Sequence, residues 1–151
     1  MRVYLAGPLF TQAEWHWNAA FASALREKDF DVYLPQERAE PMLNAAERFD
    51  PELLFRDNIA EIERADVVLA VLDQPDPDSG TCWECGYAFK LGIPIVGLRT
   101  DLRQCGDDDN PERPVNLMLA RSCAGFVRAP FNRREDMTSL VESVAKALNA
   151  L

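Results

Sequence analysis

The chain has few basic residues, and they are not clustered. Its 151 residues contain 16 Lys and Arg against 25 Asp and Glu, which gives a formal net charge of −9. Because binding to a polyanion needs a basic face, DNA, RNA and anionic membranes are poor partners. No apolar run approaches the roughly 20 residues of a membrane helix, and no basic leader with a cleavage site precedes the first strand-like segment. We therefore expect a cytoplasmic protein that binds no nucleic acid polymer and no membrane.

Residues for several common chemistries are also missing. His16 is the only histidine, which excludes histidine-based metal sites and most serine–histidine catalysis. The phosphate-binding patterns GxGxxG and GxxxxGK[ST] are absent, which disfavours dinucleotides and nucleoside triphosphates. Cys82 and Cys85 form a CxxC spacing near an expected helix start, a weak signal for a redox or zinc site. We predict neither a metal nor a cofactor.

Short β-type runs alternate along the chain with amphipathic stretches, a pattern typical of βαβ units on a parallel sheet. We predict one α/β domain over residues 1–151, a doubly wound five-stranded parallel sheet of flavodoxin-like or Rossmann-like type with helices on both faces. The expected strands are Arg2–Ala6, Asp31–Leu34, Asp66–Leu72, Pro94–Leu98 and Gly125–Val127. The expected helices are about Gln12–Lys28, Pro51–Arg64 with Asp50 as N-cap, Thr81–Leu91, Val115–Ala120 and Arg134–Leu151. The polar segments Gln36–Phe49 and Thr100–Pro114 are expected to be irregular.

Two turns are predicted to meet at the ligand crevice. In an open parallel sheet this crevice lies outside the carboxyl ends of the strands, where successive strands diverge. One turn is Gly7-Pro8 after the first strand, and the other follows the third strand with Asp73 at its start and Asp78 before the next helix. The simpler interpretations are that Asp78 caps that helix and Asp73 is a turn residue.

The expected helix Thr81–Leu91 is apolar around its whole circumference, which predicts burial on every side. Its exposed part would then need a partner surface, so we predict a homo-oligomer, a dimer or larger. Glu84 is its one acidic residue, and a buried carboxylate is normally paired, hydrogen-bonded or functional. The alternative is a solvated Glu84 that interacts with the helix dipole. Trp15, Trp17 and Trp83 are interpreted as core or subunit-interface residues.

Three carboxylates would then lie at one crevice, those of Glu84, Asp73 and Asp78. That arrangement fits glycosidic-bond chemistry, in which one carboxylate attacks the anomeric carbon and another handles the proton of the leaving group.

Four segments in this order resemble the nucleoside 2-deoxyribosyltransferases over most of the chain: VYLAGP from Val3, ADVVLAVLD from Ala65, DSGTCWECGYA from Asp78, and PVNLM from Pro114. The resemblance implies that Glu84 is the nucleophile and that Tyr4 orients its carboxylate. It implies that Asp73 and Asp78 contact the base or sugar and support proton transfer. The substrate-binding residues that it implies are Gly7, Pro8 and Gly80, with Asn116 and Met118 completing the sugar site of a neighbouring subunit.

The activity that the resemblance implies is transfer of 2-deoxyribose between purine and pyrimidine bases, with a covalent glutamyl intermediate and net retention. Two alternatives stay open: an N-glycosidase that passes the sugar of a 2′-deoxynucleoside 5′-monophosphate to water, and a noncatalytic nucleotide-binding module. Similar monophosphate glycosidases carry a serine six residues before the nucleophile, whereas Asp78 stands there in this chain. Its carboxylate would repel a phosphate, and no Lys or Arg lies between Asp66 and Phe89, so we expect unphosphorylated deoxynucleosides and free nucleobases as substrates.

Overall fold

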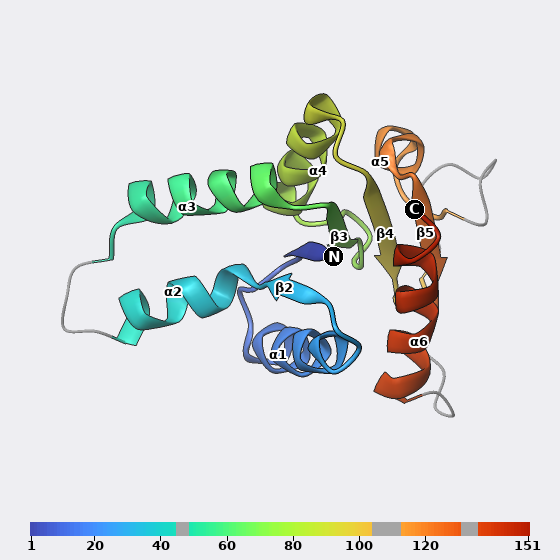
Figure 1. Cartoon of the computed structure of the whole chain (residues 1–151), viewed down its shortest axis with the longest axis horizontal. Coiled ribbons are helices and arrows are strands. Elements are labelled where there is room, and N and C mark those ends of the chain that lie inside the picture. Colours follow the sequence, from blue (N-terminus) through green and yellow to red (C-terminus); the bar gives the residue numbers. More distant parts are fainter. Residues whose placement is uncertain (45–48, 104–112, 131–135) are drawn as a thin grey trace.

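A computed structural model describes residues 1–44, 49–103, 113–130 and 136–151, and it has a five-stranded sheet in which every strand pair is parallel (Figure 1). The strand order is β2-β1-β3-β4-β5, so the chain reverses direction across the sheet between β1 and β3. The strands are β1 Arg2–Ala6, β2 Asp31–Tyr33, β3 Val67–Val71, β4 Ile95–Arg99 and β5 Gly125–Arg128. The helices are α1 Gln12–Arg26, α2 Pro35–Asn44, α3 Pro51–Arg64, α4 Ser79–Leu91, α5 Leu117–Ser122 and α6 Met137–Leu148. The predicted doubly wound α/β fold is confirmed.

Each central strand contributes side chains to both faces of the sheet, because successive side chains point to opposite sides. On one face, Val3 and Leu5 pack in a core with residues of α1 and α6. On the other face, Tyr4 and Ala6 pack with residues of α3, α4 and α5. Figure 1 shows these two sets of helices on either side of the sheet. Tyr4 therefore points toward α3 and α4.

Helix starts follow local side-chain signals. Asp50 caps α3 by accepting a hydrogen bond from the backbone N–H of Leu53 at 3.0 Å, and Pro51 is the first helical residue, as predicted. Asp78 caps the start of α4, which runs from Ser79 to Leu91. Gly92 follows as the C-cap, and its φ of 76° is the left-handed conformation that glycine adopts easily. These local signals determine where α3 and α4 begin.

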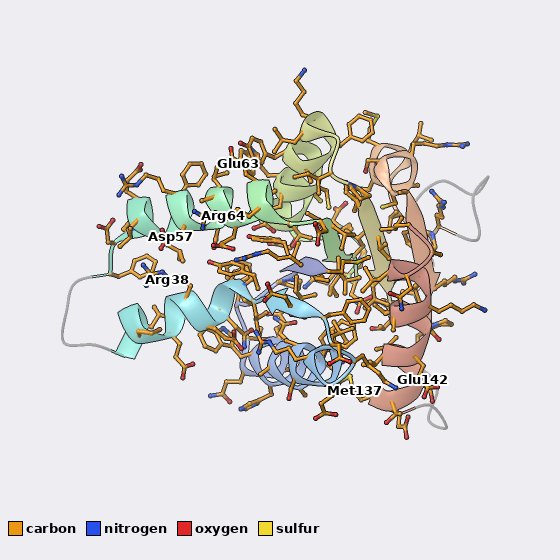
Figure 2. All side chains as sticks on the ribbon, viewed as in Figure 1. Arg38, Asp57, Glu63, Arg64, Met137 and Glu142 are labelled. Carbon is orange, nitrogen blue, oxygen red and sulfur yellow. The ribbon has the colours of Figure 1, made fainter. Side chains whose placement is uncertain are left out.

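The segment Gln36–Phe49 was expected to be irregular, and this prediction is wrong, because α2 occupies Pro35–Asn44 despite Pro41 in its interior. Contacts distant in sequence hold this helix. Gln36 is buried and donates from Nε2 to the carbonyl oxygen of Trp15 at 2.9 Å. Arg38 pairs with Asp57 of α3 at 2.6 Å, and Figure 2 shows the two side chains facing each other between α2 and α3. Tertiary contacts thus outweigh a poor helical sequence.

Helix α4 is not buried on every side in the single chain, so this prediction needs correction. Thr81, Cys85 and Ala88 are buried, but Trp83 is 50% exposed and Phe89 is 62% exposed. The helix lies over one face of the sheet, and its outer side is apolar and uncovered. Oligomerisation remains a prediction. Within the described ranges, no helix has the length and apolar character needed to cross a membrane.

Candidate active site

Glu84 and Tyr4 meet at the centre of the α3–α4 face. The Tyr4 side chain is completely buried, and its hydroxyl donates a hydrogen bond to Oε1 of Glu84 at 2.5 Å. Tyr4 comes from the middle of β1, whereas Glu84 lies in the second turn of α4, which Asp78 starts. A rigid strand and a capped helix therefore hold one oxygen of the carboxylate.

The electrostatics of this pair favour a proton on both groups. Burial raises the pKa of Glu84 to about 7, the Tyr4 hydrogen bond opposes this rise, and the charge of Asp78 adds to it. Burial, followed by the charge of Glu84, raises the pKa of Tyr4 far above its ordinary value. Tyr4 is therefore a hydrogen-bond donor at every physiological pH. Glu84 changes its charge near neutrality, which is the behaviour of a functional carboxylate.

A cavity of about 310 Å³ opens at Glu84 between α3 and α4. It is lined by Phe55, Asn58, Ile59, Ile62, Gly80, Trp83 and Glu84. This volume is at the low end of the roughly 300–1,000 Å³ typical of small-molecule sites. Apolar and aromatic walls surround one carboxylate and one amide, so the cavity suits a flat ligand with a few polar edges.

Asn58 and the aromatic walls were missed in the sequence. Phe55, Ile59 and Ile62 follow one another at helical spacing, and Asn58 is a polar residue beside that stripe. Phe55 packs against Trp83 with ring centroids 5.9 Å apart, so Trp83 is a cavity wall as well as an exposed residue. The available signal in the sequence was the Asn58 amide beside this apolar stripe. It indicates a site residue only when the packing of α3 beside α4 is known.

Asp78 and Gly80 lie at the start of α4, on the same side as Glu84. The Asp78 carboxylate accepts hydrogen bonds from the backbone N–H and the hydroxyl of Thr81, at 2.8 and 3.1 Å. Asp78 is therefore a helix cap, as its simpler interpretation predicts. Its charge also raises the pKa of Glu84. Gly80 lines the cavity directly.

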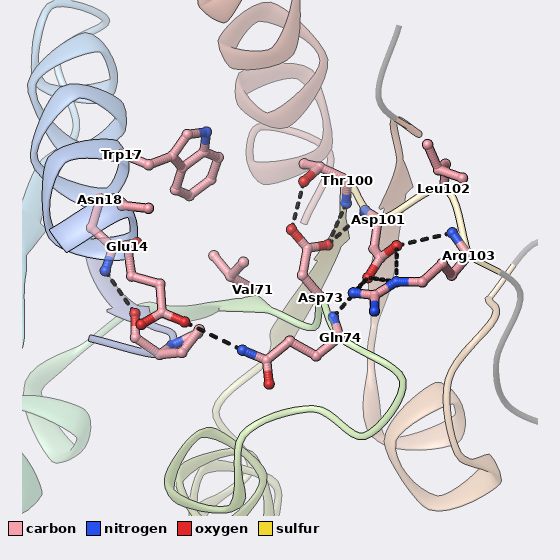
Figure 3. A pocket seen from close by; sticks show the side chains of 12 residues that line it. Glu14, Trp17, Asn18, Val71, Asp73, Gln74, Thr100, Asp101, Leu102 and Arg103 are labelled. Carbon is pink, nitrogen blue, oxygen red and sulfur yellow. Dashed lines mark hydrogen bonds and ion pairs between the residues drawn. The ribbon is translucent and has the colours of Figure 1, made fainter. Parts of the chain in front are cut away.

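Asp73 lies elsewhere. Val71 and Asp73 follow the alternation of β3 toward the α1 face, where Asp73 lines a separate cavity of about 460 Å³ (Figure 3). Its carboxylate accepts hydrogen bonds from the backbone N–H of Thr100 at 2.6 Å, the Thr100 hydroxyl at 2.5 Å and the backbone N–H of Asp101 at 2.9 Å. The structure thus joins the ends of β3 and β4 through Asp73 and does not bring it to Glu84. Of the three carboxylates expected at one crevice, only Glu84 lines the cavity between α3 and α4, and Asp78 acts on it through its charge.

The other predicted binding residues are dispersed. Pro8 is buried, lines the Asp73 cavity, and accepts a hydrogen bond on its carbonyl oxygen from Asn18 at 2.9 Å. Gly7 lies against Val71, to which an added Cβ would come within 3.3 Å. Asn116 caps α5 by accepting from the backbone N–H of Met118, whose side chain is 76% exposed. Asn116 and Met118 line neither cavity and are exposed, and their place in the sugar site of a neighbouring subunit stays a prediction.

The cysteines do not form a reactive pair. Cys82, Cys85 and Cys123 are free thiols, and Cys105 lies outside the described residues. Burial raises the pKa of Cys85 beyond its ordinary range and that of Cys123 to about 11, whereas redox-active thiols have a lowered pKa. In the part of the chain that the structure describes, no group of three or more His, Cys, Asp and Glu side chains could hold a metal ion.

Comparisons with known proteins bear on the fold and the family. An uncharacterized protein of Ureaplasma parvum serovar 3 is 30% identical in an alignment of 118 residues that covers 68% of this chain and 72% of that protein. The solved structure of a conserved protein from Enterococcus faecalis V583 is 28% identical, with a TM-score of 0.70 over 97% of this chain and 98% of that one. A 2-deoxyribosyltransferase from Bacillus psychrosaccharolyticus has the same fold, with a TM-score of 0.69 at 23% identity over 93% of this chain and 90% of that one. The sequence model of the nucleoside 2-deoxyribosyltransferases matches residues 3–118, a range that includes Tyr4, Asp78 and Glu84, and the chain therefore belongs to the nucleoside 2-deoxyribosyltransferase family.

Proposed function

We propose that the protein transfers the 2-deoxyribosyl group of a deoxynucleoside to another nucleobase, with Glu84 as the nucleophile. The observation that carries this proposal is the Glu84 carboxylate, held at 2.5 Å by the buried Tyr4 hydroxyl in a small, largely apolar cavity. Family membership supports the same chemistry. The cavity size and its aromatic walls suit a base and a deoxyribose rather than a longer ligand.

The reaction proceeds in two displacements. An oxygen of Glu84 attacks C1′ while the C1′–N bond breaks through an oxocarbenium-like transition state, and the bonding electrons leave with the base, which gains a proton. The result is a deoxyribosyl ester of Glu84. A nitrogen of the second base then attacks C1′, loses its proton, and releases the carboxylate. Two inversions at C1′ give net retention.

We assign both proton transfers to Asp78: its carboxyl group, protonated from solvent, donates a proton to the departing base and then accepts the proton that the second base loses. Of the two aspartates expected to handle it, Asp78 lies at the start of α4 on the Glu84 side, whereas Asp73 is hydrogen-bonded on the opposite face. Asp78 keeps one carboxylate oxygen, Oδ2, on Thr81, which leaves Oδ1 for proton exchange.

An uncharged deoxynucleoside fits the site best. Among the described residues that line the Glu84 cavity, none is Lys or Arg, and the nearby charge of Asp78 disfavours a phosphate. A 2′-hydroxyl would withdraw electrons from the oxocarbenium-like centre and crowd the Glu84 side. The preferred substrates are therefore unphosphorylated 2′-deoxynucleosides.

The complete site is proposed to form in a homo-oligomer. The outer side of α4 is apolar and exposed, and Asn116 and Met118 are presented on the surface at the start of α5. A neighbouring copy that covers α4 would supply this pair to the sugar.

The test is incubation of the protein with deoxyinosine and adenine, followed by chromatography for deoxyadenosine. Formation of deoxyadenosine by the wild type and not by Glu84→Ala supports the proposal, as does a mass increase of one deoxyribosyl group on acid-quenched wild-type protein. Release of free sugar at a rate independent of adenine would indicate the hydrolase instead. Absence of base release both from deoxynucleosides and from their 5′-monophosphates would indicate a noncatalytic binding module.

A further inference from the structure

An aromatic pair of α4 is fastened to α3 beside the Glu84 cavity. Trp83 and Tyr87 lie one turn apart, and their rings stack with centroids 5.3 Å apart and an interplanar angle of 12°. Phe55 of α3 packs on Trp83 with centroids 5.9 Å apart and an interplanar angle of 56°. The Tyr87 hydroxyl donates to Oε1 of Glu63 at 2.6 Å, and Figure 2 shows Glu63 at the end of α3 beside α4. Both rings of the pair are therefore held by α3.

Trp83 presents a flat apolar surface to the cavity. It lines the cavity and directly precedes Glu84 in the chain. Tyr87 covers one face of the indole because the two rings are nearly parallel, whereas the Phe55 ring meets the indole at an angle. The rest of the indole is left to form the cavity wall next to the Glu84 carboxylate. A planar ring can stack on such a wall, and water gains nothing from it.

The neighbours of Trp83 prepare this wall before a ligand binds. Half of the Trp83 side chain is exposed, so an isolated indole there could change rotamer freely. The stack with Tyr87 and the contact with Phe55 restrict that freedom, which lowers the entropy cost of stacking a ligand on the indole. Tyr87 and Glu63 lie outside the described lining of the cavity. They act on a ligand through Trp83.

We propose that the second nucleobase stacks on the indole of Trp83, and that this contact makes a base a better acceptor of the deoxyribosyl group than water. The inference rests on the proposed function and specifies its acceptor step. Stacking on the wall beside Glu84 places a nitrogen of the base near C1′ of the Glu84 ester. Tyr87 and Glu63 are positioning residues, because they hold the indole in the stacking orientation.

Water and the second base compete for the same ester. When water attacks C1′, its oxygen forms the new bond, one of its protons goes to solvent, and the Glu84 carboxylate leaves with the electrons of the broken C1′–O bond. The product is free 2-deoxyribose, whereas the same displacement by a base gives a deoxynucleoside. Stacking of a base on an aromatic side chain strengthens binding about 5- to 100-fold, and only the base gains from it. Loss of the indole should therefore shift the products toward free sugar.

The experiment varies adenine at saturating deoxyinosine and measures deoxyadenosine and free 2-deoxyribose by chromatography. In Trp83→Leu, the KM for adenine should rise about 5- to 100-fold, and the ratio of deoxyadenosine to deoxyribose at low adenine should fall by the same factor. Without adenine, kcat for hypoxanthine release should stay within about threefold of the wild type, because water attack does not use the indole. A rise in KM at nearly constant kcat distinguishes a binding role from a loss of structure.

Three further variants grade the effect. Trp83→Phe keeps a smaller stacking surface, so the KM for adenine should rise only about two- to fourfold. Tyr87→Phe keeps the stack on Trp83 and loses the Glu63 hydrogen bond, which should raise this KM about two- to fivefold. Tyr87→Leu removes the support of the indole and should have a larger effect than Tyr87→Phe. It is also the test protein where Trp83→Leu does not fold.

Tryptophan fluorescence reports the contact directly. Adenine alone should quench the emission of the wild type, since stacking brings the base onto an indole. In Trp83→Phe the remaining indoles are Trp15 and Trp17, and adenine should no longer quench the emission.

Trp17→Leu is the matched control. Trp17 also stacks on an aromatic residue four positions along its helix, Phe21 of α1, with centroids 4.8 Å apart, but it belongs to the core on the opposite face of the sheet. The replacement removes the same side chain from the same kind of pair. The KM for adenine and the product ratio should not change.

Unchanged values of the adenine KM and of the product ratio in Trp83→Leu and Tyr87→Leu would overturn the inference. Adenine quenching that persists in Trp83→Phe would also overturn it, and loss of the oligomer in the same variant would then assign Trp83 to the subunit interface. These results presuppose a wild type that forms deoxyadenosine. A wild type that forms none contradicts the proposed function itself, so the two failures are distinct.

Discussion

Replacing Glu84 with Gln should end turnover and at the same time stabilise the fold at alkaline pH. The glutamine side chain has nearly the same shape and keeps an oxygen that can accept from Tyr4, but it carries no charge. In the wild type, burial disfavours the carboxylate and raises the pKa of Glu84 to about 7. Ionisation of this group therefore works against folding, and the variant avoids that cost.

The sign and size follow from the two protonation states. The folded pKa of about 7 lies above the ordinary value of 4.5, so the protonated carboxyl contributes stability at low pH that is lost as pH rises through about 7. Full ionisation costs at most roughly 3 kcal/mol by this difference, at 1.36 kcal/mol per pH unit. Partial solvent access reduces the value, so we expect about 1–3 kcal/mol at pH 8.5. For a chain of this length, that is a rise in Tm of about 2–10 °C.

Thermal and urea unfolding of the wild type and Glu84→Gln at pH 5 and pH 8.5 would measure this effect. The stability difference should be small at pH 5 and should reach its full value at pH 8.5. Glu142→Gln is the control, because Glu142 is an exposed residue of α6 at 3.9 Å from Lys28, and its replacement should change stability by less than about 0.5 kcal/mol at either pH. An equal effect of Glu84→Gln at both pH values, or a loss of stability at pH 8.5, would refute the reasoning.

Five further results are expected. Tyr4→Phe removes the hydrogen bond that favours the Glu84 carboxylate, so the rise of kcat/KM with pH should move about one to two pH units toward alkaline pH; an unmoved pH profile would contradict the role of Tyr4. Asp73→Asn should cost about 1–3 kcal/mol in urea unfolding because it weakens the contacts to the end of β4, with kcat changed only a few-fold. A large fall in kcat at unchanged stability would instead return Asp73 to proton transfer. Gly97→Ala would place a Cβ 2.6 Å from Cδ2 of Phe126, and the resulting strain should lower stability by about 1–3 kcal/mol in the same assay. Sedimentation of the active protein should show a homo-oligomer, and full activity should persist in excess chelator; a fully active monomer would contradict the shared site.

Local signals made most of the fold predictable. Short β-type runs between amphipathic stretches located all five strands to within one or two residues. Asp50 and Pro51 marked the start of α3 because a cap and an N1 proline act within one turn. Helix α2 was missed because its stability comes from Gln36 and from the Arg38–Asp57 pair, whose partners are distant in sequence.

A site residue could be predicted where its own chemical type sets it apart from its neighbours. It could not be predicted where its role depends on which face of the sheet its side chain lies on. Glu84 stood out as the single carboxylate in an apolar helix. Asp73 was expected beside it, although it lies on the opposite face. The segment Val67–Leu72 is buried on both sides, so its uniform hydrophobicity does not reveal which residues point to which helix layer. Asn58 reaches the site only through the packing of α3 beside α4, which no local pattern encodes.

The hydrogen bond between Tyr4 and Glu84 joins residues that are 80 positions apart in the chain. Closing a loop of that length is costly in entropy and becomes favourable only when β1, β3 and α4 have assembled. We therefore expect the Tyr4–Glu84 hydrogen bond to form late in folding, and we expect partly folded chains with native helices to be inactive. After dilution from denaturant, enzymatic activity should therefore recover only when folding is complete. The helical circular dichroism signal should recover earlier.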